Sequence, residues 1–386
     1  MPSQSKENHW NVIIVGAGPA GLGCARALQC AGVERVLVLE REAVGSSFQD
    51  WPAEMRLITP SFNANSFDHP DLNSICPSTS PADMLGVEHL SGLQYAGYLL
   101  AFALHFGLEI QEGVNVKKVV PLAKGFEVIT KNARFSATKV IWAAGEFYLP
   151  TTRDIPGAHL GHHTSTVKFW GKVKGRDFIV IGGYESGIDA AYHLANKGAK
   201  VRVLSSKEPW NSQSSDPSEA LSPYTKSRLR SSREKYPKRI RLLKNSKVLG
   251  IKKKGRQFVV ETTDREFRSP NPPLLATGFQ SALTPIKELF EWSDGTPEFN
   301  ENDESTLHRG LFYSGPSLVH EGSKFCFIYK FRARFGVIAK VIAQELGGDI
   351  DGLEFYERRG LVMEDLSCCL DCRCEIESDE EANSDD

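Results

Sequence analysis

The sequence predicts an α/β protein built from two nested Rossmann-like, three-layer domains. Residues 11–39 have the pattern of a buried strand, a glycine-rich turn, a helix and a second strand, which together make a βαβ unit. Residues 178–204 repeat the same order. Two more apolar segments that end in small residues, 140–145 and 274–278, lie on either side of this second unit.

The composition limits the class of protein. The chain has 386 residues, of which 41% are hydrophobic and 24% charged, as is typical of a globular protein with two or three domains. Its formal net charge of -2 gives no global attraction to nucleic acid or to an anionic membrane. No stretch reaches the roughly 18 to 20 apolar residues of a membrane helix, and residues 1–10 lack the apolar core of a signal peptide. We therefore expect no membrane span, no nucleic-acid partner and a cytoplasmic location.

The first glycine-rich turn has the pattern of a dinucleotide-binding site. Gly16 permits the tight turn, Gly18 removes the Cβ that would block a pyrophosphate, and Gly21 lets the helix pack closely on the strand. The helix N-terminus attracts negative charge through its unpaired N–H groups. Glu40 closes the second strand, where its carboxylate can accept hydrogen bonds from a ribose 2′-hydroxyl.

The second turn departs from this pattern at its middle position. Gly182 and Gly187 hold the first and third glycine positions, but Tyr184 replaces the second glycine, so we expect pyrophosphate binding to be shifted or weakened. Ser206 occupies the position equivalent to Glu40 of the first unit, and Lys207 follows it. A hydroxyl and an ammonium can bind a 2′-phosphate, which predicts a preference for NADPH over NADH. A degenerate domain that binds no nucleotide is the alternative.

Two segments differ from the rest in charge. Residues 224–256 contain 14 Lys or Arg and one acid, Glu234. No aromatic platform repeats among them, so a solvated face or a phosphate-attracting rim is favoured over a nucleic-acid surface. Residues 375–386 contain seven acids and no base, which predicts a disordered tail.

Beyond the two turns, several motifs resemble those of a known family. The segments Gly45-Ser-Ser-Phe48, Met55-Arg-Leu-Ile-Thr-Pro60, Ala143-Ala-Gly145 and Leu275-Ala-Thr-Gly-Phe279 are similar to motifs of the two-dinucleotide-binding-domain flavoproteins. Within that family they most resemble the flavin-containing and Baeyer-Villiger monooxygenase branch. The resemblance covers about residues 10–345.

The resemblance implies cofactors and domain limits. It implies an FAD-binding domain from residues 10–160 and 284–360, an inserted NADPH-binding domain at 161–283, and a cysteine-rich acidic tail at 361–386. The first turn and the segments after it would bind FAD, and the second turn would bind NADPH. The cofactor-binding residues would then be Gly16, Gly18, Gly21, Glu40, Arg41, Ser47, Phe48, Thr59, Val116, Gly182, Tyr184, Ser186, Gly187, Ser206, Lys207, Thr277 and Gly278.

Two sites depart from the family's patterns. Ser165 replaces the histidine of the monooxygenase fingerprint between the domains. The Gly-Asp pair that many relatives place at the flavin ribityl chain is here Gly315-Pro316. The adjacent His162 and His163 are interpreted as solvated linker residues rather than catalytic ones.

The preferred function that follows is a flavin-dependent monooxygenase. In such an enzyme NADPH reduces FAD, and O₂ then forms a flavin hydroperoxide that oxidises a small-molecule substrate. Asn63 and Ser61 are the candidates for side chains at the reacting edge of the flavin. The expected partners are a small-molecule substrate and O₂, and a homodimer is compatible with the sequence.

Two alternatives remain open. A pyridine nucleotide-disulfide reductase, similar to thioredoxin reductase, needs a dithiol at the flavin, and Cys369 and Cys372 are the candidates. The cluster Cys368–Cys374 would otherwise be an incidental solvated tail or a Zn²⁺ or monovalent copper ligand set, and we assign no metal site. The second alternative is a flavin-binding regulatory protein without turnover.

Overall fold

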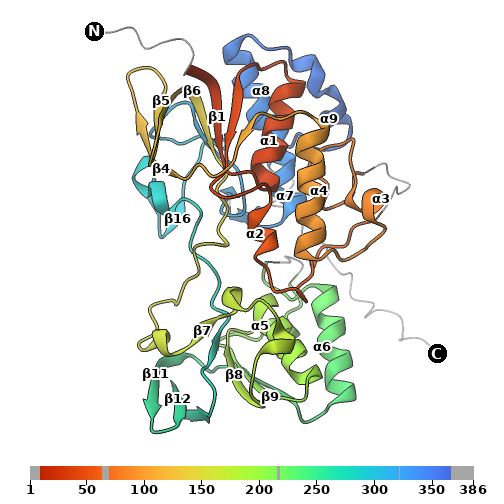
Figure 1. Cartoon of the computed structure of the whole chain (residues 1–386), viewed down its shortest axis with the longest axis vertical. Coiled ribbons are helices and arrows are strands. Elements are labelled where there is room, and N and C mark those ends of the chain that lie inside the picture. The colour runs from red at the N-terminus through yellow and green to blue at the C-terminus, as the bar shows by residue number, and fades with distance from the viewer. Residues whose placement is uncertain (1–8, 63–68, 215–217, 321, 367–386) are drawn as a thin grey trace, which may run out of the picture.

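The computed structural model describes residues 9–62, 69–214, 218–320 and 322–366. They form two α/β units that follow one another along the longest axis of the molecule (Figure 1). Each unit contains parallel strands with helices packed against them, so the predicted α/β fold with two Rossmann-like units is confirmed. Asn63, Cys369 and Cys372 lie outside the described residues.

The first unit is built on a seven-stranded sheet with the order β3-β2-β1-β6-β5-β4, to which β17 adds by pairing with β6. Five of these strands run parallel, and β4, β5 and the start of β6 form an antiparallel meander. Apolar residues at every position from Val12 to Val15 are buried, as expected for a strand covered on both faces. The strands are β1 (His9–Val15), β2 (Val36–Leu39), β3 (Ile110–Gln111), β4 (Val116–Pro121), β5 (Phe126–Thr130), β6 (Arg134–Trp142) and β17 (Leu311–Tyr313).

Helices of the first unit pack closely on one another beside the sheet (Figure 1). A Cβ on Gly23 in α1 would lie 2.0 Å from the Phe335 ring in α8, so α1 and α8 approach as closely as a glycine allows. Ser91 and Gln94 form a capping box that starts α4. The helices are α1 (Pro19–Cys30), α2 (Ser46–Gln49), α3 (Pro81–Leu85), α4 (Gly92–His105), α7 (Ile328–Phe331), α8 (Phe335–Leu346) and α9 (Glu354–Arg358).

The second unit has a five-stranded parallel sheet with the order β10-β9-β8-β14-β7 and a separate three-stranded antiparallel sheet, β11-β12-β13. Two helices, α5 (Glu185–Asn196) and α6 (Pro223–Lys235), pack against each other beside the parallel sheet. The strands are β7 (His162–His163), β8 (Asp177–Ile181), β9 (Lys200–Leu204), β10 (Ile240–Leu243), β11 (Val248–Lys254), β12 (Gln257–Thr262), β13 (Glu266–Ser269) and β14 (Leu274–Leu275).

Short elements complete the chain. Two hairpins pair β15 (Trp292–Ser293) with β16 (Thr296–Pro297) and β18 (Val319–His320) with β19 (Ser323–Lys324). The 3-10 helices are η2 (Ala158–Leu160), η3 (Thr164–Thr166), η4 (Trp170–Lys172), η5 (Pro209–Asn211), η6 (Thr284–Leu289), η7 (Arg332–Arg334) and η8 (Ile350–Leu353). Among the described residues, no helix is both long and apolar enough to cross a membrane.

The second unit is inserted into the first. The chain leaves the first sheet after β6 and returns to it at β17, which pairs in parallel with β6. The two connecting segments run side by side, with a β-bridge between Pro150 and Phe279 and a hydrogen bond of 2.7 Å from the Gln280 N–H to the Leu149 carbonyl. The nesting predicted from the sequence is therefore confirmed.

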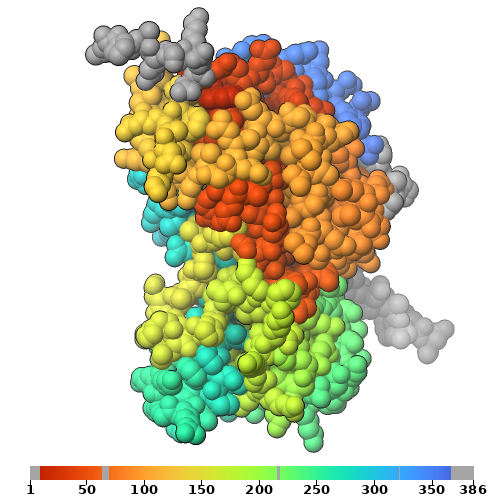
Figure 2. All heavy atoms as spheres, in the orientation of Figure 1, coloured from red at the N-terminus to blue at the C-terminus, as the bar shows by residue number. Residues whose placement is uncertain are grey.

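The two units also touch beside these connections. The Ala53 N–H donates to the Lys168 carbonyl at 2.9 Å, and the Lys168 ammonium binds the Asp50 carboxylate. The Glu54 carboxylate accepts from the N–H groups of Trp170 and Gly171, each at 3.0 Å. Figure 2 shows the early, red part of the chain meeting the yellow-green second unit on this face.

Candidate functional site

The first glycine-rich turn opens the N-terminus of α1. Gly18 is the residue that precedes the helix, no side chain caps that end, and Pro19 occupies the first turn. A Cβ on Gly16 would lie 2.4 Å from the Ala143 carbonyl oxygen, and one on Gly21 would lie 1.9 Å from the Gly16 oxygen. A Cβ on Gly18 would meet nothing within 4 Å. Two glycines thus allow close packing, whereas the third borders open space, as a pyrophosphate site requires.

Glu40 reaches into this turn. Its side chain is 8% exposed, and its carboxylate accepts hydrogen bonds from the Ala17 N–H at 2.7 Å and from the Glu42 N–H at 2.9 Å. The Ser46 hydroxyl donates to it at 3.5 Å. These bonds fix the carboxylate at the edge of the turn, where its remaining lone pairs can accept from ribose hydroxyls.

The loop before β4 lies beside the backbone of Glu40. The Val114 N–H donates to the Glu40 carbonyl at 2.7 Å, and the Gly113 N–H donates to the Glu42 carbonyl at 3.1 Å. Val116 begins β4 two residues later. The structure therefore brings the segment that leads to the predicted cofactor residue Val116 next to the backbone of Glu40, the predicted ribose-binding residue. Gly18, Glu40 and this segment therefore lie together at one edge of the first sheet.

The other predicted FAD residues are spread around the turn. Arg41 forms an ion pair with Glu42 at 3.3 Å, and its guanidinium lies 3.9 Å from the centre of the Tyr148 ring. Ser47 lies in α2, and Phe48 is buried against Trp51. The contacts of Phe48 are those of a core residue.

Thr59 and Ser61 are held by a residue that the sequence reasoning missed. The Asn73 amide donates to the Thr59 carbonyl at 2.9 Å and to the Ser61 hydroxyl at 2.8 Å. Ser61 is only 3% exposed. The hydroxyl proposed for the flavin's reacting edge therefore has a structural partner inside the protein.

Asn73 and Arg332 leave hydrogen-bonding atoms without partners in the same region. Asn73 Oδ1 and Arg332 Nε are buried and accept or donate no hydrogen bond among the described residues. The Arg332 guanidinium donates to the carbonyls of Pro70, Asp71 and Ser74, and burial lowers its pKa to about 10. No sequence signal joined these residues, because about 260 positions separate the arginine from its acceptors.

Glu146 is a second residue missed by the sequence reasoning. It follows β6 and the Ala143-Ala-Gly145 segment, at the edge of the sheet where the first turn also lies. Burial raises the pKa of its carboxyl to about 7. This carboxyl can therefore gain or lose a proton near neutral pH.

The second turn has nearly the same backbone as the first. Tyr184 precedes α5 with φ -85° and ψ -166°, against φ -87° and ψ -172° for Gly18 before α1. Cβ atoms on Gly182 and Gly187 would lie 2.1 Å and 2.0 Å from carbonyl oxygens, so both positions require glycine for packing. The Tyr184 side chain is 37% exposed and stands where the first turn leaves open space.

The remaining predicted nucleotide residues lie at the same edge of the second sheet or in the connection between the units. Ser206 and Lys207 are exposed directly after β9, and Ser186 lies in the first turn of α5. Thr277 donates its hydroxyl to the Thr151 carbonyl, and the Gly278 carbonyl accepts from the Thr151 N–H at 3.0 Å. Thr277 and Gly278 thus fasten the two connecting segments to each other.

His163 is not solvated, contrary to the expectation for the adjacent histidines. It is 9% exposed, its Nδ1 lies 2.7 Å from the Ser165 hydroxyl, and its Nε2 lies 3.0 Å from the Gly278 carbonyl. Burial lowers its pKa, which favours the neutral ring. The sequence placed it in a polar linker, but β7 draws it into the edge of the second sheet. His162 is exposed, as expected.

Four cysteines lie among the described residues. Cys24, Cys30 and Cys76 form no disulfide, and burial raises the pKa of Cys24 to about 12. No group of three or more metal-binding side chains occurs among the described residues. The cysteine cluster 368–374 lies outside them.

The chain matches a family of flavoproteins. The model for "Pyridine nucleotide-disulphide oxidoreductase" matches residues 13–315. Bacilliredoxin reductase Bdr of Bacillus subtilis (strain 168) is 24% identical over 346 residues, 86% of this chain and 97% of that protein. Thioredoxin reductase of the same organism is 25% identical over 54% of this chain, and the match spans only 58% of that protein's length.

Solved structures show the same fold at lower identity. Bacillithiol disulfide reductase Bdr (YpdA) from Staphylococcus aureus has a TM-score of 0.73 and 20% identity over 88% of this chain and 99% of that one. A flavin-containing monooxygenase from Stenotrophomonas maltophilia has a TM-score of 0.68 and 15% identity, with the same coverage. Similar proteins thus occur on both sides of the division between reductases and monooxygenases, and the family is broader than the branch that the motifs resembled. The chain belongs to the pyridine nucleotide-disulphide oxidoreductase family and is an oxidoreductase that depends on FAD and NAD(P).

Proposed function

We propose that this oxidoreductase is a flavin-dependent monooxygenase that takes electrons from NADPH. The overall reaction is NADPH + H⁺ + O₂ + substrate → NADP⁺ + H₂O + oxygenated substrate, in which one oxygen atom enters a small molecule and the other leaves as water. When bound, FAD supplies the two-electron transfer from NADPH and the reaction with O₂. The residues of this chain bind the cofactors, orient them and hold a proton.

The observation that supports the FAD site of this proposal is the open space at Gly18. This space lies at an uncapped helix N-terminus beside the Glu40 carboxylate. No protein atom there would clash with a Cβ on Gly18. A glycine at that position is explained by a ligand that comes close to the backbone. Gly18 and the α1 N–H groups would hold the FAD pyrophosphate, and Glu40 would hold the ribose.

NADPH is proposed for the second unit. Ser206 and Lys207 are exposed after β9, where a 2′-phosphate would lie. The nearby Glu208 is engaged by Lys244 at 2.9 Å, and this contact lowers the pKa of the Glu208 carboxyl. Its negative charge is therefore partly compensated. Tyr184 must turn away from the pyrophosphate or stack beside it.

The acceptor is proposed to be O₂ because the described thiols are poorly suited to carry electrons. Cys24 and Cys76 are buried, and a thiol with a pKa of about 12 is protonated at neutral pH, so Cys24 is a weak nucleophile. Glu146 is the residue we propose to hold a proton at the sheet edge during turnover.

A disulfide reductase is the second candidate. Bacilliredoxin reductase Bdr of Bacillus subtilis is matched over 97% of its length, which favours the disulfide reductase hypothesis. In that case Cys369 and Cys372 would form the dithiol that passes electrons to a disulfide substrate.

Ending the chain after Ser367 separates the two candidates. For a monooxygenase, NADPH-driven O₂ consumption and product formation with a panel of thioethers, amines and ketones should stay nearly unchanged. For a disulfide reductase, the same truncation should preserve flavin reduction but abolish reduction of disulfide substrates. A truncated protein that loses all disulfide reduction, in a parent that oxygenates none of the panel, would overturn the proposal.

A further inference from the structure

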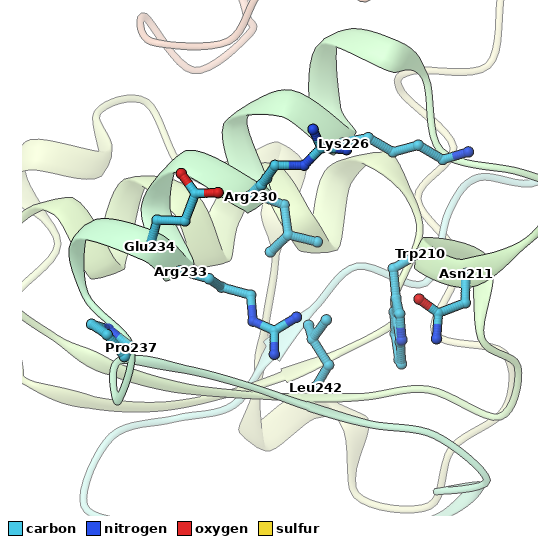
Figure 3. A pocket seen from close by; sticks show the side chains of 9 residues that line it. Trp210, Asn211, Lys226, Arg230, Arg233, Glu234, Pro237 and Leu242 are labelled. Carbon is cyan, nitrogen blue, oxygen red and sulfur yellow. The ribbon is translucent and has the colours of Figure 1, made fainter.

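A basic pocket lies between α6 and β10, next to the second glycine-rich turn (Figure 3). Its volume is about 460 Å³. Arg233 extends from α6 toward Leu242 on β10, and Trp210 forms another wall (Figure 3). An adjoining hollow shares Trp210 and Arg233 and adds Lys238 and Arg241.

The positive charges of this surface are not neutralised within the described chain. Arg230, Arg233, Lys238 and Arg241 are exposed, and none of the four forms an ion pair with a described residue. Lys252 and Lys254 on β11 differ, because they pair with Glu261 and Glu266 of the neighbouring strands. We call the surface formed by these four residues the basic face.

The acidic residues near the basic face do not neutralise its positive charge. Glu208 is bound to Lys244, and Glu234 is the other acid that lines the pockets. Four unpaired cations therefore face two carboxylates, one of which is already paired. Arginine side chains in such a setting bind carboxylates through charge-assisted, often bidentate, hydrogen bonds.

The basic face is close to the second turn. Trp210, which lines the pocket, also packs on that turn, because a Cβ on Gly183 would lie 2.7 Å from its ring. At the end of β9, the Ser205 N–H donates to the Leu243 carbonyl of β10 at 2.9 Å. A negatively charged segment on the basic face would thus reduce the positive potential that attracts the phosphates of NADPH.

The same chain contains a segment of complementary charge. Residues 375–386 carry seven acids and no base. Nine residue steps separate Leu366, the last described residue, from Glu375, a span of up to about 30 Å at roughly 3.3 Å per residue. A compact chain of this length has a radius of gyration of about 21 Å. The connection is therefore longer than this radius, and on this ground we place the acidic segment within range of the basic face.

We propose that residues 375–386 dock on the basic face and compete there with NADPH. Tethering gives the segment an effective concentration on the order of millimolar, so even weak ionic contacts would keep the face occupied. The competition rests on the proposed binding of NADPH to the second turn, whereas the docking itself does not.

The test compares the full chain with a chain that ends after Cys374, which keeps the cysteines and removes only the acidic segment. A fluorescent synthetic peptide of residues 375–386 is titrated against each protein without nucleotide, by anisotropy at low salt. We expect the shortened chain to bind the peptide at least about tenfold more tightly than the full chain, whose own segment blocks the face. Arg230→Glu/Arg233→Glu should remove that binding.

A matched control variant makes the same change of charge on the surface of the first unit. Lys124→Glu/Lys131→Glu alters two exposed lysines of the first unit and should leave peptide binding intact. The docking would be overturned if the full and shortened chains bound the peptide equally, or if neither bound it. It would also be overturned if the control variant lost as much peptide binding as the arginine variant.

NADPH affinity tests the competition separately. The shortened chain should bind NADPH several-fold more tightly than the full chain at low salt, and the difference should vanish near 1 M salt, where the screening length is about 3 Å. Equal affinities at low salt would overturn the competition. If neither chain binds NADPH, the proposed function fails, and the peptide titration still decides the docking.

Discussion

At the scale of the residue, Gly18 is expected to serve FAD binding and Gly21 to serve helix packing. One substitution at each position tells these two roles apart. Gly18→Val should leave the unfolding free energy of the FAD-free protein nearly unchanged, because its Cβ has no neighbour within 4 Å, but should weaken FAD binding at least about tenfold. Gly21→Ala should instead destabilise the fold by about 1–3 kcal/mol, since its Cβ would lie 1.9 Å from a carbonyl oxygen. Denaturant unfolding and FAD titration measure both. A Gly18→Val protein with normal FAD affinity would contradict the assignment of the first turn.

Lys207 is expected to select the nicotinamide cofactor. A charge-assisted hydrogen bond to a 2′-phosphate is worth about 1.5–3 kcal/mol, so Lys207→Glu should reduce the preference for NADPH over NADH by roughly ten- to a hundredfold. The measurement is the rate of flavin reduction at several concentrations of each cofactor. Lys253→Glu, at an exposed lysine on β11 away from the end of β9, is the control. Equal use of NADPH and NADH by the parent protein would refute this role.

Glu146 should make stability depend on pH in a defined direction. Its pKa is raised to about 7 by burial, so between about pH 4.5 and 7 the folded state keeps a proton that the unfolded state has lost. The unfolding free energy contributed by this group therefore falls as pH rises through that window and is level above it. Glu146→Gln should remove the fall, as denaturant unfolding from pH 5 to 8 would show. Parallel pH profiles for the two proteins would contradict the burial of this carboxyl.

At the scale of the element, a buried ionic cluster fixes the start of α8. Asp303 is fully buried and accepts from Arg334 Nε at 3.0 Å and from His320 Nε2 at 2.6 Å. Asp303→Ala would leave the Arg334 guanidinium buried without its counter-ion, which typically costs about 3–5 kcal/mol. Denaturant unfolding measures the loss. Arg309→Ala, which removes an exposed ion pair with Glu345, should change stability little; an equal effect of both variants would contradict the account.

Local sequence patterns predicted some elements better than others. The second strand of the βαβ unit predicted over residues 11–39 is β2, and an apolar run between polar residues defines both of its ends. The apolar residues between 108 and 116 do not form one strand, because Gly113 adopts φ +72° and separates β3 from the start of β4. Helix α6 gave no apolar periodicity, since most of its residues are polar and only a few are buried.

At the scale of the whole molecule, the sequence shows what is local and hides what is distant. The two glycine-rich turns were readable because each lies within one βαβ unit. Arg332 donates to the carbonyls of Pro70 and Ser74, which lie about 260 residues earlier in the chain. No pattern in either segment predicts this contact. The pKa of Glu146 and the burial of His163 likewise depend on packing between elements that the sequence does not place.

A single turnover of the purified, FAD-loaded full chain tests whether electrons pass from NADPH through FAD to O₂. The protein is mixed with NADPH in the absence of oxygen, the flavin's visible absorbance is followed, and oxygen is then admitted without any disulfide. We predict that NADPH bleaches the flavin and that oxygen restores its colour, with the same rates in a chain that ends after Ser367. A flavin that NADPH does not bleach, or one that regains its colour only with a disulfide and an intact tail, would contradict it.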